Sequence, residues 1–341
     1  MMKKIILGLS MLLVLTLGTT SCFKKDTKIE PHPVDTTKVE MIAMTQYYVN
    51  QVYFNLMTGE QVSQNLKTDC DLLFSSADTG FLIRMNTASF MMAASTNKSS
   101  FDQVMDTTGL EWAFDPSSGN VDSTVFVDWI KILGVDTLFP QQVYVINRGL
   151  DALGRNLGLR KIIFHSLKND RYSFSYCQMD NTDRHDVVVE KDPGFNTIQF
   201  SFATNGSLQT EPATDNWDLL FTQYTTMLIT DAGDNYPYLL TGVLINPSGV
   251  GVAFDSTMVF NDVTIDSVLY LNYSTKQDVI GYDWKELIGD INGGDIYYKC
   301  YPNYNYFIRT RTGVYFKLKF TGFYEPDTGE KGYPTFQYRR L

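Results

Sequence analysis

The side chains that carry most enzyme chemistry are scarce in this sequence. The chain has three histidines, His32, His165 and His185, and none has the spacing of a metal-binding or general-base motif. It has no glycine-rich phosphate loop and no Gly-x-Ser-x-Gly nucleophile turn. Paired carboxylates meet only in space and leave no sequence pattern, so they stay open as an alternative. We therefore predict that the protein is not an enzyme.

The cysteines do not form a metal or disulfide pattern either. Cys22 is followed by three widely separated cysteines, Cys70, Cys177 and Cys300. An odd count without close spacing indicates neither a disulfide framework nor a zinc site. We expect these three to be small buried apolar residues, with a bridge from Cys177 to Cys300 as the alternative.

Aromatic residues are the most unusual feature of the composition. They make up 14% of the chain, with 21 Tyr and 22 Phe, and the segment 296–309 (IYYKCYPNYNYFIR) is especially rich in them. One buried strand face cannot hold all of these rings, so some are expected at the surface. Exposed aromatic side chains favour flat ligands or protein partners. The alternative is a row of tyrosines that covers one face of a sheet.

The chain repeats a short acidic and aromatic motif. The sequence TDCDLLF at 68–74 returns as DNWDLLF at 215–221. Further matches follow in the same order, with loops of different length between them: 52–62 with 198–208, 109–115 with 249–255, 128–134 with 283–289, 143–149 with 305–311, 160–166 with 316–322 and 172–176 with 334–338. A shared order with variable loops indicates two related units.

Within the repeated motif we interpret Asp71 and Asp218 as structural. A carboxylate at the start of a strand can accept hydrogen bonds from backbone donors at a nearby turn. The preceding residue is Cys70 in one copy and Trp217 in the other, and such an exchange is typical of packing positions.

The pattern of the segments predicts strands. Stretches such as IQFSF (198–202) and VYFKLKF (314–320) alternate apolar and polar residues, and short turn sequences separate them. Helix signals are confined to 99–106 and 283–289. We therefore predict an all-β fold of two tandem antiparallel β-sandwich-like modules with one or two short helices.

The N-terminus of the chain predicts a membrane-anchored protein. Two lysines precede an apolar run that has the length of a secretory signal, and Cys22 follows small residues, as lipid attachment requires. Plain secretory cleavage is the alternative. The expected organisation is a lipoprotein signal peptide at 1–21, a flexible tether at 22–45, and modules at 46–180 and 190–341. The formal net charge of −10 makes nucleic acid an unlikely partner class, because phosphates would be repelled.

The second unit resembles the HmuY-like haem-binding lipoproteins of Bacteroidetes, and the first unit resembles them more weakly through the repeat. The resemblance rests on an FSF-type strand, a Trp-Asp strand, a hairpin that leads into a Lys-x-x-Phe-Thr-x-Tyr pattern, and a closing Phe-x-Tyr. In this sequence these are IQFSFATNGSL (198–208), NWDLLFTQYTTMLIT (216–230), GVLIN (242–246) and the run from Asn305 to Tyr338.

This resemblance implies a non-enzymatic lipoprotein of the outer membrane, exposed at the cell surface. Such a protein would capture haem or another tetrapyrrole and pass it to a TonB-dependent receptor. The alternative is a surface lipoprotein that binds a protein or glycan partner without haem.

The family holds haem iron with two axial side chains, His or Met, and one of them precedes the strand at 305–309. The corresponding segments here, 283–305 and 128–142, contain neither residue. We name Met227 and Met258 as speculative replacement ligands in the second unit, although methionine also fills gaps in ordinary cores. The further methionines considered in the first unit are Met85, Met91, Met92 and Met105.

Overall fold

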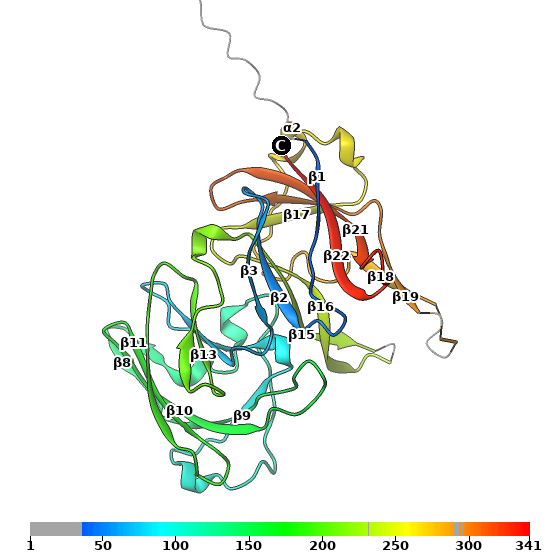
Figure 1. Cartoon of the computed structure of the whole chain (residues 1–341). Helices are drawn as coiled ribbons and strands as arrows, with labels where there is room; N and C mark the ends of the chain where they lie inside the picture. The colour runs from blue at the N-terminus through cyan, green and yellow to red at the C-terminus, as the bar shows by residue number, and fades with distance from the viewer. Residues whose placement is uncertain (1–35, 231, 290–292, 295) are drawn as a thin grey trace, which may run out of the picture. The chain divides into compact units, whose positions relative to one another are not determined.

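The structure of the protein is a computed structural model, which describes residues 36–230, 232–289, 293–294 and 296–341. Strands dominate these residues, and the named strands pair in antiparallel fashion (Figure 1). The predicted all-β class is therefore confirmed. No helix among the described residues is long and apolar enough to span a membrane. The predicted signal peptide and Cys22 lie outside the described residues.

Two five-stranded sheets share one pattern of connections. In each, four strands follow one another across the sheet in chain order, and a fifth strand pairs with the outer edge of the last of them. The first sheet has the order β1 (Lys38–Met41), β22 (Lys331–Arg340), β21 (Tyr315–Tyr324), β20 (Asn305–Arg309), β17 (Gly251–Asp255). The second has the order β12 (His185–Glu190), β11 (Arg171–Cys177), β10 (Leu159–Lys168), β9 (Val143–Asn147), β6 (Met92–Ser95).

Two four-stranded sheets mix hairpins from distant parts of the sequence. Hairpin β2–β3 adds to β15 through pairs such as Phe54 with Leu219, and β13–β14 adds to β4 through pairs such as Phe200 with Leu72. The orders are β16 (Asn235–Ile245), β15 (Leu219–Ile229), β2 (Asn50–Asn55), β3 (Glu60–Leu66), and β14 (Gly206–Leu208), β13 (Thr197–Ser201), β4 (Leu72–Ser75), β5 (Ile83–Met85). Each repeated unit thus gives its leading hairpin to a sheet built on the other unit.

The exchange of hairpins means that the two predicted modules are not separate in the structure. Residues 35–341 form one compact unit, and the segments 46–180 and 190–341 share two sheets within it. The sequence matches between the units nevertheless fall on equivalent strands, such as β2 with β13 and β4 with β15. One match does not: 249–255 contains β17, whereas its partner segment 109–115 makes only a bridge at Ala113, and β6 occupies the equivalent strand position.

The predicted tether ends earlier than residue 45. Strand β1 pairs with β22, so that Lys38 lies opposite Tyr338, and Ile42 and Met44 are fully buried in the core. A charged strand such as Lys-Val-Glu-Met is well tolerated at the edge of a sheet, where its side chains reach water. The charge pattern that suggested a tether is therefore also compatible with an edge strand.

Helical structure is limited to short segments. The α-helix α2 spans Ile265–Val268, and 3-10 helices span Thr87–Ser89, Phe101–Gln103, Val121–Ser123, Val127–Trp129, Thr214–Asn216 and Phe260–Asp262. The helix signal at 99–106 therefore forms a single 3-10 turn. The helix predicted at 283–289 is wrong, because Lys285–Ile288 is strand β18 and pairs with β19 (Tyr297–Cys300). The matching position in the other unit is the hairpin β7 (Lys131–Leu133) and β8 (Asp136–Leu138).

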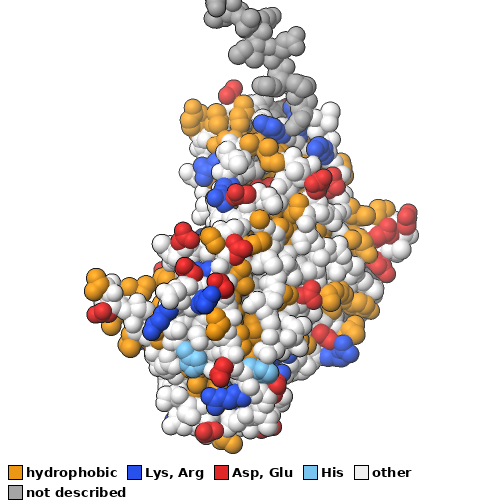
Figure 2. Space-filling view, turned by 60° about the vertical axis from the view of Figure 1, so that its left-hand side comes forward, with side chains coloured by type: hydrophobic (Ala, Val, Ile, Leu, Met, Phe, Trp, Pro, Cys, Tyr) orange, Lys and Arg blue, Asp and Glu red, His pale blue; other side chains and the backbone are white. Residues whose placement is uncertain are grey.

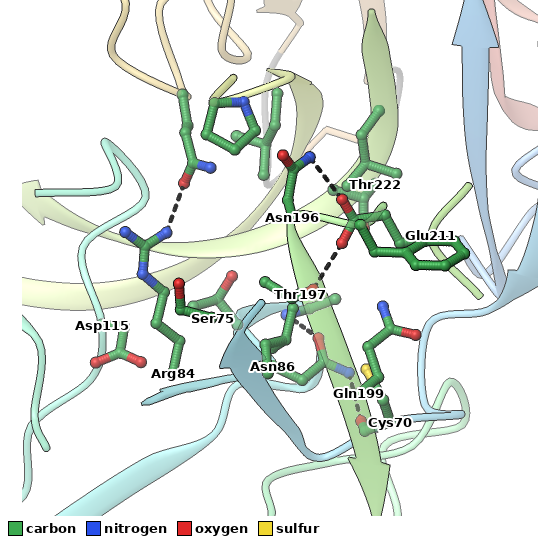
Figure 3. A pocket seen from close by; sticks show the side chains of 18 of the residues that line it. Cys70, Ser75, Arg84, Asn86, Asp115, Asn196, Thr197, Gln199, Glu211 and Thr222 are labelled. Carbon is green, nitrogen blue, oxygen red and sulfur yellow. Dashed lines mark hydrogen bonds between the residues drawn. The ribbon is translucent and has the colours of Figure 1, made fainter. Parts of the chain in front are cut away.

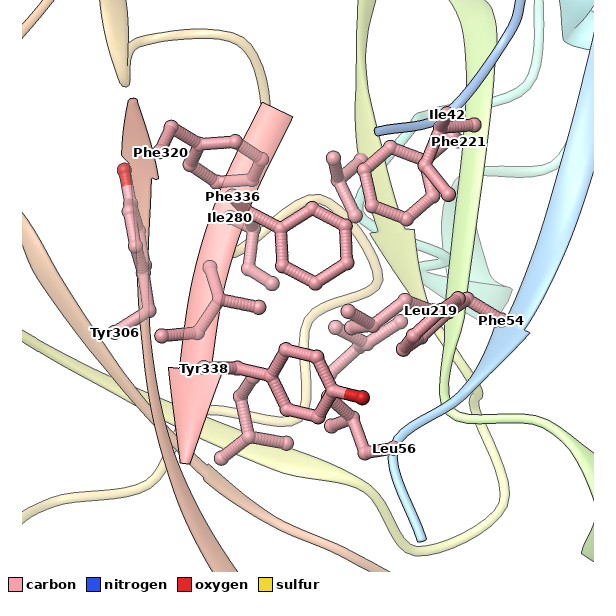
Figure 4. Packing of buried hydrophobic residues seen from close by; sticks show 14 of the residues in the cluster. Ile42, Phe54, Leu56, Leu219, Phe221, Ile280, Tyr306, Phe320, Phe336 and Tyr338 are labelled. Carbon is pink, nitrogen blue, oxygen red and sulfur yellow. The ribbon is translucent and has the colours of Figure 1, made fainter. Parts of the chain in front are cut away.

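Strand β22 shows how the sequence encodes these sheets. Along Lys331–Arg340 buried and partly exposed residues alternate, with Phe336 and Tyr338 pointing inward. Figure 4 shows these two rings facing Phe54, Leu219 and Phe221 of the four-stranded sheet. A second cluster packs in the same way between the β4–β13 sheet and the β9–β11 strands. Each core thus lies between a five-stranded sheet and a shared sheet.

The two aspartates of the repeated motif hold the exchanged hairpins. The Phe202 N–H donates to Asp71 Oδ2 at 2.7 Å, and the Leu56 N–H donates to Asp218 Oδ2 at 2.8 Å. Both carboxylates are buried. The interpretation of Asp71 and Asp218 as structural is confirmed. They differ in charge balance, because Arg148 pairs with Asp71, whereas no ion pair to Asp218 occurs within the described residues.

The pKa of Asp218 predicts a pH-dependent stability. Burial raises the pKa of Asp218 from 3.8 to about 6 in the folded state, so ionisation at neutral pH costs about 1–3 kcal/mol of folding free energy. This destabilisation by the ionised Asp218 is absent below pH 4 and complete above pH 6. The variant Asp218→Asn keeps an acceptor for the Leu56 N–H and removes the charge. We expect its stability, relative to wild type, to rise by this amount between pH 4 and pH 7 in urea unfolding. Parallel pH profiles for the two proteins would contradict the assignment.

The other sequence interpretations on single residues can be checked directly. Cys70, Cys177 and Cys300 are free, and the first two are buried. His165 is satisfied by Gln141 Oε1 at 2.7 Å and Ser175 Oγ at 2.6 Å, which is an ordinary structural environment. Figure 2 shows basic and acidic side chains interspersed over one face, without a large basic area on that face.

Candidate functional site

An aromatic cavity of about 410 Å³ lies beside β15, β17 and β20. Its lining includes four tyrosines, one phenylalanine and two aspartates. The residues are Tyr224, Thr226, Phe254, Asp278, Val279, Ile280, Gly281, Tyr282, Asp283, Tyr304 and Tyr306. The volume falls in the usual range for small-molecule pockets, which is about 300–1,000 Å³.

The walls of this aromatic cavity are rings that touch one another. Phe254 meets Tyr304 edge to face, with centroids 4.8 Å apart, and lies 5.5 Å from Tyr306. Tyr304 also stacks on Tyr301 at 4.5 Å. Tyr306 is buried, whereas Phe254 is 48% exposed and forms part of the open side. The cavity therefore offers an aromatic surface with one accessible ring.

Two glycines place the segment 278–283 against the sheet. Gly281 forms a bridge with Val243 of β16, and a Cβ at Gly242 would collide with the Gly281 carbonyl oxygen. Gly281 also has φ +60°, a conformation that favours glycine. This close approach brings Tyr282 and Asp283 to the cavity formed by the strands.

The segment after the cavity is anchored by a buried lysine. Lys285 Nζ donates to the Thr241 carbonyl at 2.7 Å and lies over the ring of Trp284 at 4.2 Å. Trp284 in turn stacks on Phe320 at 4.0 Å. Burial lowers the pKa of Lys285 to about 7. These contacts fix the start of β18 and, through it, the position of Asp283.

The polar side-chain groups of the aromatic cavity are carboxylates, phenols and the hydroxyl of Thr226. Ser117 Oγ donates to Asp278 Oδ2 at 2.6 Å. Burial raises the pKa of Asp283, and the neighbouring Tyr282 phenol and Lys285 act in the opposite direction. Burial also raises the pKa of Tyr282, with the Asp283 charge as the next cause. The cavity can therefore accept hydrogen bonds at its carboxylates and stack flat groups on its rings.

Met227 and Met258, the ligands named from the sequence, do not line this cavity. Met227 is on β15 next to Thr226, but successive side chains of a strand point to opposite faces, and Met227 is 46% exposed. Met258 packs partly buried against the cluster that contains Val263 and Phe307. The structure thus does not bring the two sulfur atoms into one described pocket.

The methionines of the first unit are equally dispersed. Met85 and Met91 are buried in the second core, Met92 is half-buried, and Met105 is 66% exposed. Among the residues that the structure describes, no cluster of three His, Cys, Asp or Glu side chains could hold a metal ion.

Sequence reasoning found part of this site. Tyr304 and Tyr306 belong to the aromatic segment 296–309, which was expected to expose some rings. It missed Tyr224, Phe254 and Tyr282, which come from three other segments. The only available signal was the general abundance of aromatic residues, because rings distant in sequence converge only after folding.

Antiparallel sheets around an aromatic cavity are typical of a protein that binds a small molecule. The chain belongs to the HmuY family, since the family model described as HmuY protein matches residues 47–338. This single match runs through both sequence units.

Solved structures resemble the chain only distantly. Apo PinO from Porphyromonas gingivitis shares 11% identity, covering 90% of this chain and 98% of its own, with a TM-score of 0.30. The apo HmuY analog TFO from Tannerella forsythia shares 12% identity, covering 91% and 99%, with a TM-score of 0.24. No curated protein matches the chain.

Proposed function

We propose that this protein is a lipid-anchored, non-enzymatic binding protein that captures haem or another tetrapyrrole at the outer membrane. Membership of the HmuY family supports this proposal. The observation that carries it is the aromatic cavity, which includes Asp283 and Tyr304 from the segment where the family resemblance places an axial ligand. A TonB-dependent receptor is the corresponding partner for delivery.

The fit to haem has two parts. Porphyrin is flat and largely apolar, so it suits the faces of Phe254, Tyr304 and Tyr306. The described lining residues include no His, Met or Cys, and their side-chain oxygens are phenols, carboxylates and the Thr226 hydroxyl. Tyrosine is a known haem ligand. Burial of the porphyrin, rather than a strong axial bond, is therefore the proposed main source of affinity.

A haemin titration of the full-length protein tests this function. We expect a shifted and sharpened Soret band at one equivalent. The variant Phe254→Ala removes the accessible ring of the cavity, and we expect it to raise the Kd about tenfold, since a ring contact contributes about 0.5–1.5 kcal/mol beyond its buried area. The matched control Val259→Ala changes an exposed apolar residue outside the cavity and should bind like wild type.

The same titration decides the remaining ligand candidates. If Met227 or Met258 is an axial ligand, its replacement by leucine removes the spectrum of a sulfur-ligated iron. If the Tyr282 phenol is the ligand, Tyr282→Phe removes the spectrum of a phenolate-ligated iron. A free-haemin spectrum for wild type, in both oxidised and reduced forms, would contradict the proposal.

That negative result would favour a protein or glycan partner. One observation supports this second candidate: the hairpin β7–β8 exposes Ile132, Leu133, Val135 and Leu138, each more than half in contact with solvent. Apolar side chains grouped on a projecting hairpin are typical of protein contacts.

A further inference from the structure

A second and larger cavity, of about 460 Å³, lies where the two shared sheets approach each other. Its lining comes from β2, β4, β5, β13, β15 and β16, and from several loops. It shares no lining residue with the aromatic cavity. We call it the central cavity. Figure 3 shows it with Glu211 and Arg84 at opposite sides.

Glu211 presents a buried carboxylate to the central cavity. The residue is 5% exposed. Its Oε1 accepts from Asn196 Nδ2 at 2.7 Å, and its Oε2 accepts from Thr197 Oγ1 at 2.6 Å. These two donors are neutral, and no Lys or Arg forms an ion pair with Glu211 within the described part of the chain. Burial raises its pKa, which reflects the uncompensated charge.

Arg84 presents a positively charged guanidinium to the central cavity, on the side opposite Glu211 (Figure 3). Its guanidinium donates to Gln277 Oε1 at 3.1 Å and to the Gly119 carbonyl at 2.9 Å. Both acceptors are neutral. Asp115, which lines the same cavity, accepts the N–H groups of Met85 and Val125 at 2.7 and 2.8 Å. Burial lowers the pKa of Arg84, although Asp115 acts against this. Arg84 therefore keeps donors for a further anionic group.

The wall beside Glu211 is aromatic. Tyr53 and Trp217 are both buried and meet edge to face, with centroids 5.0 Å apart. Aromatic rings near a carboxylate suit a cationic group, because a ring face and the negative charge both attract a cation. The central cavity thus has an acidic and aromatic end and a basic end.

We propose that the central cavity binds a small zwitterion of dipeptide size, whose ammonium group pairs with Glu211 and whose carboxylate pairs with Arg84. Glu211 is buried without a counter-charge, and Arg84 has only the Asp115 carboxylate near it, with which it forms no ion pair in the described part of the chain. This ligand supplies a direct partner to both charges together. A neutral sugar leaves both charges unpaired. A dianionic porphyrin brings negative groups toward Glu211. The site goes beyond the proposed capture of tetrapyrrole and does not depend on it.

Titration calorimetry with the full-length protein tests the proposal with three probes. Glycyl-leucine carries both charges, N-acetyl-glycyl-leucine lacks the ammonium, and glycyl-leucinamide lacks the carboxylate. We expect glycyl-leucine to bind and each blocked probe to bind at least about tenfold more weakly, since charge-assisted hydrogen bonds are lost. Equal affinity for the three probes, or no heat at millimolar concentrations of glycyl-leucine, overturns the proposal.

Two variants connect these charges to the residues. Glu211→Gln keeps an acceptor oxygen for Asn196, and its NH2 group can donate to the Thr197 hydroxyl. It should weaken glycyl-leucine about tenfold while leaving N-acetyl-glycyl-leucine unchanged. Arg84→Gln should weaken glycyl-leucine but not glycyl-leucinamide. A merely structural role would weaken all probes alike. Phe254→Ala, in the aromatic cavity, serves as the control and should bind glycyl-leucine like wild type, so failure of haemin binding and failure of this site are separable.

Discussion

Replacing Arg148 with methionine is expected to lower the free energy of unfolding by about 3–5 kcal/mol, because it leaves a buried carboxylate without its counter-charge. Arg148 Nε lies 2.7 Å from Asp71 Oδ1, and a second guanidinium nitrogen donates to Oδ2 at 3.1 Å. The two side chains are 8% and 3% exposed. The guanidinium also lies 5.7 Å from the ring centre of Phe202. Urea unfolding of the variant measures the loss.

Two controls separate charge from packing. Arg155→Met removes an arginine that is 75% exposed and paired with Asp151, and we expect a change within about 0.5 kcal/mol. The double variant Asp71→Asn with Arg148→Met removes both charges and should be more stable than Arg148→Met alone. If the double variant is no more stable, the loss arises from packing and not from the buried charge.

The fragment 67–212 is expected to fold by itself, whereas the fragments 46–180 and 190–341 are expected to remain largely unfolded. The first contains every strand of the β4–β13 sheet and of the β6–β12 sheet, together with the core between them. Fragment 46–180 instead carries β2–β3 without β15, and it lacks β13. Fragment 190–341 carries β13–β14 without β4. Each of these two therefore exposes half of a core and unpaired strand edges.

Circular dichroism and urea unfolding of the three fragments check this expectation. A cooperative transition for 67–212 alone supports the exchange of hairpins. A mixture of 46–180 and 190–341 should regain a cooperative transition, because together they supply every strand of the two shared sheets and all of the two five-stranded sheets except the edge strands β1 and β12. Independent cooperative folding of both sequence-defined modules would show that the exchanged pairing is not required for stability.

The repeated aspartates show the limit of local sequence. Both copies of the Asp-Leu-Leu-Phe motif predict a strand with a carboxylate at its start, and both form one. The sequence did not predict that Asp71 meets Arg148, because the position that matches Arg148 in the repeat is Thr310. A partner 77 positions away has no local signature. One motif therefore yields an ion pair in one unit and a carboxylate of raised pKa in the other.

The helix predicted at 283–289 failed for a related reason. The sequence Asp-Trp-Lys-Glu-Leu-Ile-Gly has an apolar spacing that suits a helical turn. In the structure Trp284 stacks on Phe320 and Lys285 donates to Thr241, so tertiary contacts favour an extended chain over the local preference.

The strand content, the repeated order of the strands and the resemblance to the HmuY family could all be predicted from the amino-acid sequence. These follow from side-chain alternation and motif order, which are local properties of the chain. Which hairpin joins which sheet could not be predicted in this way, because an antiparallel strand edge can accept many partners and the choice depends on the packing of whole cores. The two cavities could not be predicted from the sequence either. Tyr224 and Tyr304, or Arg84 and Glu211, are far apart in sequence, and no local pattern records that folding brings them to one pocket.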